Sequence, residues 1–187
     1  MSVLIRTSLT HPLQIAEVSV PPAKGSIGIT FCPGKKQVSA MSGAWDRDLG
    51  LDLDTIKAWG ASTIVTLIEP HEIQELKVTG IDSESVDRGL EWLRMPITDV
   101  SPPDHRFAQA WRQHGARLVD EVRAGTRVVV HCKGGLGRAG TVAALMLVEL
   151  GMAPDEAIRT VRTARKGAIE TPEQERYIRE WVPRRSV

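Results

Sequence analysis

The stretch from Arg127 to Thr141 (RVVVHCKGGLGRAGT) constrains the fold of this chain more than any other. Its three consecutive valines form a short β-branched run, which is typical of a strand buried on both faces of a parallel sheet. Gly134, Gly135 and Gly137 then follow within four positions. They let the backbone turn tightly and point successive N–H groups at one place, an arrangement that binds anions. The stretch therefore predicts a strand, an anion-binding loop and a helix.

The helix predicted after this loop covers 141–150 (TVAALMLVEL), is almost wholly apolar and ends at Gly151. Its N-terminus, with the positive end of the helix dipole, faces back toward the loop. Cys132 opens the loop and Arg138 closes it six positions later. Helix N-termini, backbone N–H groups and guanidinium groups all stabilise a thiolate, and the same groups bind phosphoryl oxygens. We therefore expect Cys132 to be a nucleophile that faces a phosphate site.

This loop has the pattern His-Cys-x-x-Gly-x-Gly-Arg between an apolar strand and an apolar helix. It resembles the phosphate-binding loop (P-loop) of cysteine-dependent protein tyrosine and dual-specificity phosphatases. The resemblance implies that the phosphate is held by Lys133, Gly134, Gly135, Leu136, Gly137 and Arg138. The alternative, a buried inert cysteine with a solvated arginine, gives no reason for the glycines. His131 is expected to hold the loop by hydrogen bonds rather than to transfer protons, and Lys133 either favours an anionic substrate or is solvated.

The composition describes an ordinary globular chain of 187 residues, 42% hydrophobic and 25% charged, with a net charge of +1. We expect a loose arm at 1–12 and a single domain at 13–187. The balanced charge gives no general reason to expect a nucleic-acid partner, and no apolar run approaches the roughly 18 residues of a membrane span. Two cysteines, Cys32 and Cys132, are too few for a disulfide framework or a zinc site. These features predict a cytoplasmic protein that needs no metal or cofactor.

Elsewhere the chain alternates predicted strands with predicted helices. Strands are expected at 13–20, 26–31, 63–68 and 90–95, and helices at 54–60, 70–80, 83–89, 105–124, 154–165 and 172–181. The segment 37–51 is predicted to be a surface loop over which Trp45 packs. This order predicts an α/β fold with a mainly parallel central sheet flanked by helices, of the dual-specificity phosphatase type.

A thiolate that attacks a phosphate ester expels an alkoxide or phenoxide unless an acid protonates it. Asp99 and Asp104 lie in a proline-rich loop upstream of the cysteine, and Asp104 is expected to cap the helix at 105–124. The segment from Met95 to Pro103 resembles the general-acid loop of small dual-specificity phosphatases, including the regenerating-liver and cyclin-dependent-kinase-associated types. That resemblance implies Asp99 as the acid. The alternative is an aspartate that only forms a turn.

Similarity to the cyclin-dependent-kinase-associated type extends over about residues 12–182, where similar short segments follow one another in the same order. Near the C-terminus, Thr171-Pro172-x-Gln174 also resembles the segment beside the phosphate loop in lipid and Cdc14-like phosphatases. This implies that Gln174 orients the water that hydrolyses a phosphocysteine intermediate. An ordinary polar residue in the first turn of a helix is the alternative.

Two positions depart from these families. Most members have Ser or Thr after the loop arginine, where its hydroxyl stabilises the departing thiolate; here that residue is Ala139, as in the regenerating-liver type. We therefore expect slow hydrolysis of the phosphoenzyme unless Thr141 substitutes. Lipid phosphatases of the tensin type carry a second lysine where this chain has Leu136, which weakens a phosphoinositide interpretation.

The resemblance implies a protein phosphatase that acts on phosphotyrosine, and by extension on phosphoserine and phosphothreonine. The alternatives are a phosphoinositide phosphatase and a phosphoprotein-binding module with little turnover. Arsenate reductases and low-molecular-weight phosphatases fit less well, because their acid follows the cysteine.

Two further features are open. Lys35 and Lys36 either flank an anion site or lie on a solvated turn, which the turn sequence favours. Cys32 is either a small buried residue, the favoured interpretation, or a disulfide partner for an oxidised Cys132.

Overall fold

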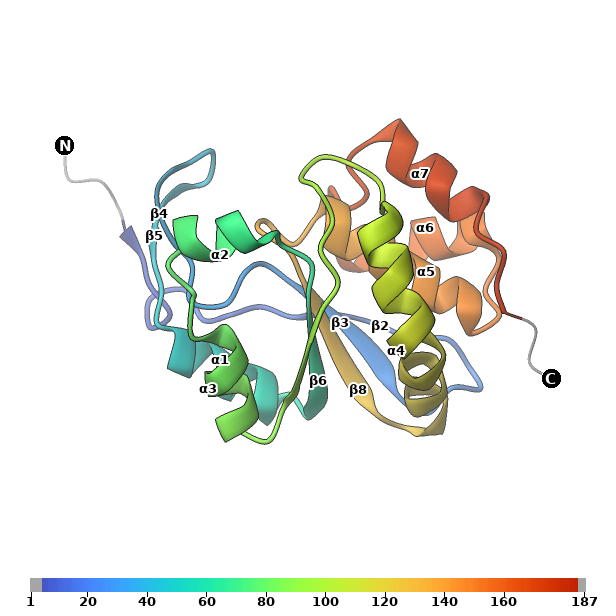
Figure 1. Ribbon diagram of the computed structural model, residues 1–187, viewed down its shortest axis with the longest axis horizontal. Helices are drawn as coiled ribbons and strands as arrows, with labels where there is room; N and C mark the ends of the chain where they lie inside the picture. The colour runs from blue at the N-terminus through green and yellow to red at the C-terminus, as the bar shows by residue number, and fades with distance from the viewer. Residues whose placement is uncertain (1–4, 185–187) are drawn as a thin grey trace.

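The structure, a computed structural model, describes residues 5–184. Its main sheet has five strands in the order β2-β3-β8-β6-β7 (Figure 1). They are β2 (Ala16–Val18), β3 (Ser26–Thr30), β8 (Arg127–His131), β6 (Ala61–Thr66) and β7 (Glu91–Arg94). Only β2 is antiparallel to its neighbour, and the other pairs are parallel. The predicted mainly parallel sheet is confirmed, with β8 at its centre.

Helices cover both faces of this sheet (Figure 1). On one face lie α4 (His105–Ala124), α5 (Gly137–Glu149), α6 (Pro154–Ala164) and α7 (Pro172–Arg179), and on the other α1 (Leu49–Ala58) and α3 (Ile81–Asp87). The short α2 (Pro70–Glu75) lies beyond the carboxyl end of β6. A central sheet between two helical layers is the predicted fold class.

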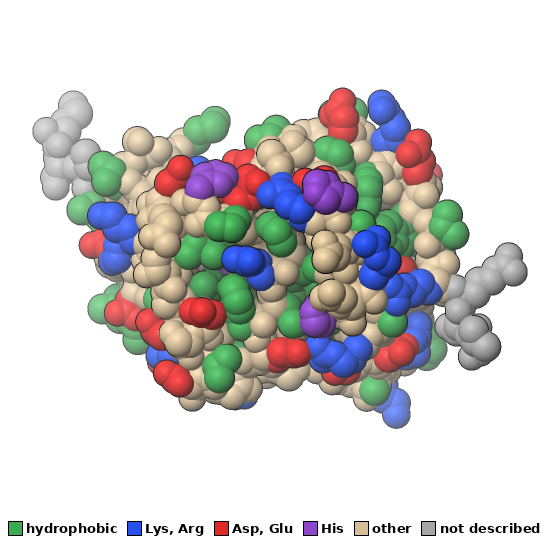
Figure 2. Space-filling model, viewed as in Figure 1, with side chains coloured by type: hydrophobic (Ala, Val, Ile, Leu, Met, Phe, Trp, Pro, Cys, Tyr) green, Lys and Arg blue, Asp and Glu red, His purple; other side chains and the backbone are tan. Residues whose placement is uncertain are grey.

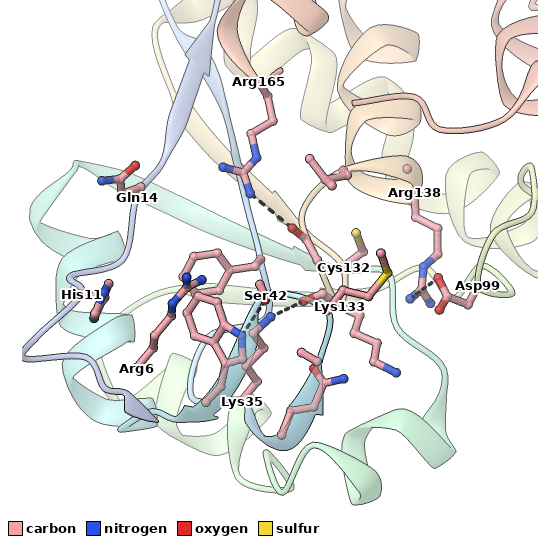
Figure 3. A pocket seen from close by; sticks show the side chains of 18 of the residues that line it. Arg6, His11, Gln14, Lys35, Ser42, Asp99, Cys132, Lys133, Arg138 and Arg165 are labelled. Carbon is pink, nitrogen blue, oxygen red and sulfur yellow. Dashed lines mark hydrogen bonds and ion pairs between the residues drawn. The ribbon is translucent and has the colours of Figure 1, made fainter. Parts of the chain in front are cut away.

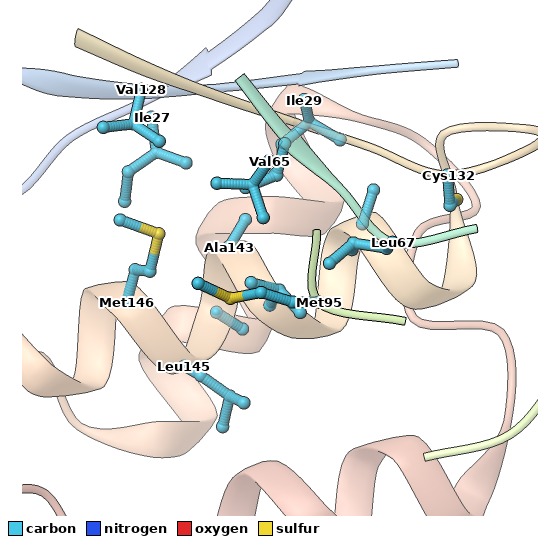
Figure 4. Close-up of a cluster of buried hydrophobic side chains, with 14 of the residues drawn as sticks. Ile27, Ile29, Val65, Leu67, Met95, Val128, Cys132, Ala143, Leu145 and Met146 are labelled. Atoms are coloured by element: carbon cyan, nitrogen blue, oxygen red, sulfur yellow. The ribbon is translucent and has the colours of Figure 1, made fainter. Parts of the chain in front are cut away.

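The valines of β8 divide the core between the two faces. Val128 and Val130 belong to the larger apolar cluster, beneath α4 and α5, whereas Val129 belongs to the smaller one, beneath α1. All three are fully buried, as expected for the central strand of a parallel sheet. Figure 4 shows Val128 above Met146 of α5, and places Cys132 at the edge of the same cluster. The packed core thus fixes the end of β8, where the cysteine begins its loop.

Two predicted helix starts are wrong. α5 begins at Gly137 rather than Thr141, so Arg138 is in its first turn. α1 begins at Leu49 rather than near Asp54, because the Asp48 carboxylate accepts a hydrogen bond from the Leu51 N–H and caps the helix earlier. In both cases the helix begins earlier than the sequence pattern indicates, because its first turn contains glycine, a poor helix former.

The predicted surface loop at 37–51 is also wrong. It contains an antiparallel hairpin of β4 (Lys36–Ala40) and β5 (Gly43–Asp46), and β1 (Ile5–Arg6) pairs in parallel with β5 to complete a small second sheet. The expected loose arm therefore does not hold for residues 5–12, since Arg47 also donates a 2.7 Å hydrogen bond to the His11 carbonyl. Residues 1–4 of that arm lie outside the described residues. These short strands are largely exposed, so they lack the apolar alternation that marks a strand in a sequence.

Figure 2 shows acidic and basic side chains interspersed over one face of the molecule, in keeping with the small net charge. Across residues 5–184, every helix is too short or too polar to cross a membrane.

Candidate active site

A cavity of about 940 Å³ lies where β8 ends (Figure 3). Its walls are the loop at residues 132–138, here called the cysteine loop, the loop at residues 95–104, here called the Asp99 loop, the β4–β5 hairpin, and the segment that follows β1. Of the residues predicted for the site, it brings together Cys132, Lys133, Gly134, Leu136, Gly137, Arg138 and Asp99. Gly135, His131, Thr141 and Gln174 lie outside its lining.

The backbone of the cysteine loop is arranged to bind an anion. Gly135 has a φ of +69°, and a Cβ there would lie 2.5 Å from the backbone of Thr30 and Phe31, so only glycine fits. Within residues 5–184, the N–H groups of residues 133–137 have no hydrogen-bond acceptor. The loop carbonyls are used instead, because Arg165 donates to those of Gly134 and Gly135 at 3.2 and 3.1 Å. Cys132, 3% exposed, lies beside these free donors.

Arg138 is held by a residue that the sequence analysis did not identify. Its two terminal nitrogens donate to the two carboxylate oxygens of Glu72 in α2, at 2.6 and 2.9 Å, and both side chains are almost fully buried. Burial acts to raise the pKa of Glu72, but the hydrogen bond from Arg138, the N–H of Glu69 and the nearby positive charges together hold the pKa below its ordinary value. Burial likewise acts to lower the pKa of Arg138, but the hydrogen bond to Glu72 and the acidic groups around the guanidinium together raise it. The guanidinium is therefore charged and fixed in one plane.

The Asp99 carboxylate lies over this guanidinium. Asp99 Oδ1 is 2.9 Å from an Arg138 terminal nitrogen, and about half of the Asp99 side chain is exposed to the cavity mouth. Val100 has a φ of +56°, a left-handed conformation that is strained for a β-branched residue, and its N–H donates to Asp99 Oδ1. Asp104 caps α4 through the Arg106 N–H, as predicted. Of the two candidate acids, the structure therefore places only Asp99 in the cavity.

His131 is buried beneath the cysteine loop and tied at both ring nitrogens. Its Nε2 lies 2.8 Å from the Thr66 hydroxyl, which also accepts a hydrogen bond from Trp92, and its Nδ1 lies 3.3 Å from the Cys132 carbonyl. Burial lowers the pKa of His131 to about 4, so the ring is neutral at physiological pH. These contacts fit the predicted role in holding the loop.

Gln174 lies behind the cavity, where it joins α7 to two loops. Its amide oxygen accepts from the N–H groups of Glu170 and Thr171, and its amide nitrogen donates to the Ser101 carbonyl in the Asp99 loop at 3.2 Å. The predicted cap at Thr171 is confirmed by a capping box with Gln174. One amide N–H of Gln174 is left for any other partner.

Ala139 is fully buried and supplies no hydroxyl to Cys132. The hydroxyl of Thr141, the suggested substitute, donates to the Gly137 carbonyl one turn back in α5 at 2.7 Å. A hydroxyl has one proton, so in this arrangement Thr141 has none to offer the sulfur.

One group within residues 5–184 has the composition of a metal site, namely Glu69, His71 and Glu72, whose ligand atoms lie within 4.8 Å of one another. Its carboxylates are already occupied by cationic groups. Glu72 binds Arg138 with both oxygens, and Glu69 binds Arg106 at 2.8 Å. A metal ion there would compete with both arginines.

The family model described as PTP-SAK, Swiss Army Knife protein, DSP-PTPase phosphatase domain, matches residues 37–178, which is well over half of the chain. The chain belongs to the DSP-PTPase phosphatases. The fold and the hydrolase class predicted from the cysteine loop are thereby confirmed.

Relatives of this DSP-PTPase are named protein tyrosine phosphatases. The human (Homo sapiens) protein tyrosine phosphatase type IVA 3 is 32% identical over 133 residues, which cover 71% of this chain and 70% of that protein. The crystal structure of kinase associated phosphatase, with its catalytic site cysteine replaced by serine, has a TM-score of 0.79 at 25% identity and covers 90% of this chain and 93% of its own. Tk-PTP has a TM-score of 0.62 at 29% identity, covering 88% of this chain and 100% of its own.

Proposed function

We propose that this DSP-PTPase hydrolyses phosphate monoesters on proteins, phosphotyrosine in particular, through a phosphocysteine intermediate on Cys132. One observation carries the proposal: Cys132, Asp99 and Arg138 line the same cavity, with Arg138 fixed by Glu72 and 2.9 Å from Asp99. A nucleophile, an acid and an anion-binding fork in one place are the parts that phosphoryl transfer to a thiolate needs.

The reaction has two displacements at phosphorus. In the first, the Cys132 sulfur attacks, the bond from phosphorus to the ester oxygen breaks, and Asp99 gives its proton to the departing oxygen. In the second, a water attacks phosphorus and passes a proton to Asp99, the bond from sulfur to phosphorus breaks, and the thiolate re-forms as orthophosphate leaves. Arg138 and the free N–H groups of the cysteine loop bind the three other phosphoryl oxygens in both steps.

The role of Asp99 is tested with two aryl phosphates whose leaving phenols differ in acidity. Asp99→Asn is expected to lose about 10²–10⁴-fold in kcat/KM with phenyl phosphate, whose poor leaving group needs a proton, and much less with a dinitrophenyl phosphate. The decline in wild-type turnover with rising pH that general-acid catalysis produces is expected to vanish in the variant.

Asp104→Asn is the matched control for Asp99→Asn, because it makes the same change in the same loop and asparagine still caps α4. It is expected to match wild type on both substrates. Equal losses on the two substrates in Asp99→Asn would show that Asp99 does not protonate the leaving group.

The second displacement is expected to limit turnover, because neither Ala139 nor Thr141 offers a hydroxyl to the departing sulfur. Ala139→Ser is expected to raise kcat about tenfold, which corresponds to one hydrogen bond to a charged group. Rapid-mixing kinetics check this: wild type should give a burst of phenol release, which shrinks in Ala139→Ser. A wild-type reaction without a burst, and an Ala139→Ser variant of unchanged kcat, would contradict the prediction.

Two sequence predictions remain part of the proposal. The predicted domain at 13–187 acts as one unit, to which residues 5–12 are joined through β5 and Arg47. Its two cysteines, both without a disulfide in the structure, favour a reducing compartment such as the cytoplasm. The amide N–H of Gln174 that does not bond to Ser101 is the group that would orient the water of the second displacement.

A further inference from the structure

The cavity carries more positive charge than one phosphate requires. Its lining includes the cations Arg6, Lys35, Lys133, Arg138 and Arg165 against the carboxylates Asp99 and Glu170. The whole chain has a net charge of only +1, so this excess is local. Glu72 already neutralises Arg138, whereas Arg6 and Lys35 form no ion pair with any residue in 5–184. Within residues 5–184, no carboxylate of the protein therefore neutralises Arg6 or Lys35.

Lys35 is the more unusual of these two cations. The sequence analysis favoured a solvated turn, which is wrong for this residue, since Lys35 is 4% exposed and lines the cavity. Its ammonium group donates one hydrogen bond, to the Lys133 carbonyl at 3.3 Å. It also lies 4.4 Å from the centre of the Trp45 ring and 5.0 Å from that of Phe31. A buried ammonium with no carboxylate beside it is costly, and burial lowers the pKa of Lys35 to about 8.

Arg6 approaches the same aromatic wall. Its guanidinium carbon is 5.2 Å from the centre of the Trp45 ring, so two cations without acidic partners converge on one indole. In the view of Figure 3, Arg6 lies on the opposite side of the cavity from Arg138 and Asp99. A cation that no carboxylate neutralises is stabilised by an anion from outside the protein, and both of these cations line the same cavity. Lys35 reaches the Lys133 carbonyl at the edge of the cysteine loop, and Arg6 lies farther along the same wall, so the pair offers a negatively charged group a place beside the cysteine loop.

The cavity has room for such a group. Its volume of about 940 Å³ is close to the upper limit of the pockets that enclose drug-sized molecules, which span roughly 300–1,000 Å³. One end is the cysteine loop, where the scissile phosphate binds, and the Trp45 wall with its cations belongs to the same cavity.

We propose that Arg6 and Lys35 form a second anion subsite, which binds a phosphate or carboxylate group of the same substrate molecule whose scissile phosphate lies in the cysteine loop. This inference rests on the proposed function, because both groups belong to one phosphate ester. On a protein substrate the second group is a neighbouring phosphorylated or acidic residue. A polyphosphorylated cyclitol offers the same chemistry on a smaller molecule.

The experiment compares substrates that differ only in the second anion. One pair is a phosphotyrosine peptide with neutral neighbours and the same peptide with a second phosphorylated residue; the other is an inositol monophosphate and an inositol bisphosphate. Phenyl phosphate supplies a reference rate for each variant. In wild type the second phosphate is expected to raise kcat/KM at least about tenfold in one pair, and the gain should shrink at high salt.

The subsite is tested by Arg6→Ala and Lys35→Met, with Arg94→Ala as the matched control. Arg94, in β7, lies outside the cavity lining, so its removal takes away the same charge elsewhere. Arg6→Ala and Lys35→Met are expected to reduce the gain toward one, relative to each variant's own rate on phenyl phosphate, whereas Arg94→Ala keeps it. Because Lys35 is buried, its variant is used after thermal unfolding shows it folded; Arg6→Ala carries the test otherwise.

Each other outcome overturns a distinct claim. Hydrolysis of phenyl phosphate without any gain from a second phosphate in either pair overturns the subsite and leaves the proposed function standing. A gain that survives in Arg6→Ala and Lys35→Met overturns its assignment to these residues. No hydrolysis of phenyl phosphate overturns the proposed function itself. A gain confined to the inositol pair supports the subsite and assigns its substrate to cyclitol phosphates rather than peptides.

Discussion

The Cys132→Ser variant is expected to hydrolyse phenyl phosphate at least about 10⁵-fold more slowly than wild type, the scale seen when an enzyme loses its nucleophile. A hydroxyl ionises far less readily than a thiol, so the groups that stabilise a thiolate do not produce a comparable nucleophile from serine. The nearest imidazole, that of His131, is neutral but tied to the Thr66 hydroxyl and the Cys132 carbonyl. Steady-state kinetics without added metal measure the loss.

Cys32→Ser is the matched control for Cys132→Ser. Cys32 is fully buried and outside the cavity lining, and its thiol donates a hydrogen bond to the Pro33 carbonyl, which a serine hydroxyl can replace. It is expected to keep wild-type turnover. Inorganic phosphate should still stabilise Cys132→Ser against heat, because the loop N–H groups and Arg138 remain. Residual turnover near the wild-type rate in Cys132→Ser would remove the thiolate from the mechanism.

The second large effect is expected from Glu72, whose removal leaves the buried guanidinium of Arg138 without its partner. Glu72→Ala should lower the free energy of unfolding by about 3–5 kcal/mol at neutral pH, the usual cost of breaking a buried ion pair. It should also reduce kcat by about 10²-fold, because Arg138 loses the contacts that fix its plane. Chemical denaturation and aryl phosphate kinetics measure the two losses.

The stability loss in Glu72→Ala has a defined pH dependence. The pKa of Glu72 is lowered in the folded protein, so its contribution to stability is complete above the ordinary glutamate pKa and is lost as pH falls through the folded value. The difference in stability between wild type and Glu72→Ala should therefore narrow in acid.

Glu91→Ala is the matched control for Glu72→Ala. It removes an exposed ion pair with Arg117 and should cost no more than about 1 kcal/mol. Equal stability of Glu72→Ala and wild type at neutral pH would contradict the anchoring role.

The strand, cysteine loop and helix could be predicted because each is encoded by neighbouring residues. The valine run, the glycines and the apolar helix need no information from elsewhere in the chain. Glu72 could not be found in this way. It lies in the first turn of α2, where an acid after Pro70 is what any helix favours, and its bond to Arg138 spans 66 positions. The one feature of the sequence that pointed to Glu72 was its place in a helix that begins just past the end of β6, and that feature alone is a weak indication of a role in the site.

The wall of the cavity opposite Arg138, which β4 and β5 form, could not be predicted from the sequence for a different reason. β4 and β5 are short and largely exposed, so no burial pattern marks them, and β1 joins them only by pairing with β5. Lys35 follows a turn in the sequence, where lysines are usually solvated, yet this small sheet closes over it. Long-range pairing of polar strands thus produced the part of the site that sequence periodicity cannot show.

The most direct test of the central claim is to look for phosphate on Cys132. Wild type is mixed with an aryl phosphate, quenched within the first turnover and digested, and the peptide that contains the cysteine loop is examined by mass spectrometry. The proposed mechanism predicts a phosphoryl group on Cys132, accumulating in wild type because Ala139 slows its hydrolysis and less abundant in Ala139→Ser. Turnover with no phosphorylated Cys132 at any quench time, in either protein, would contradict it.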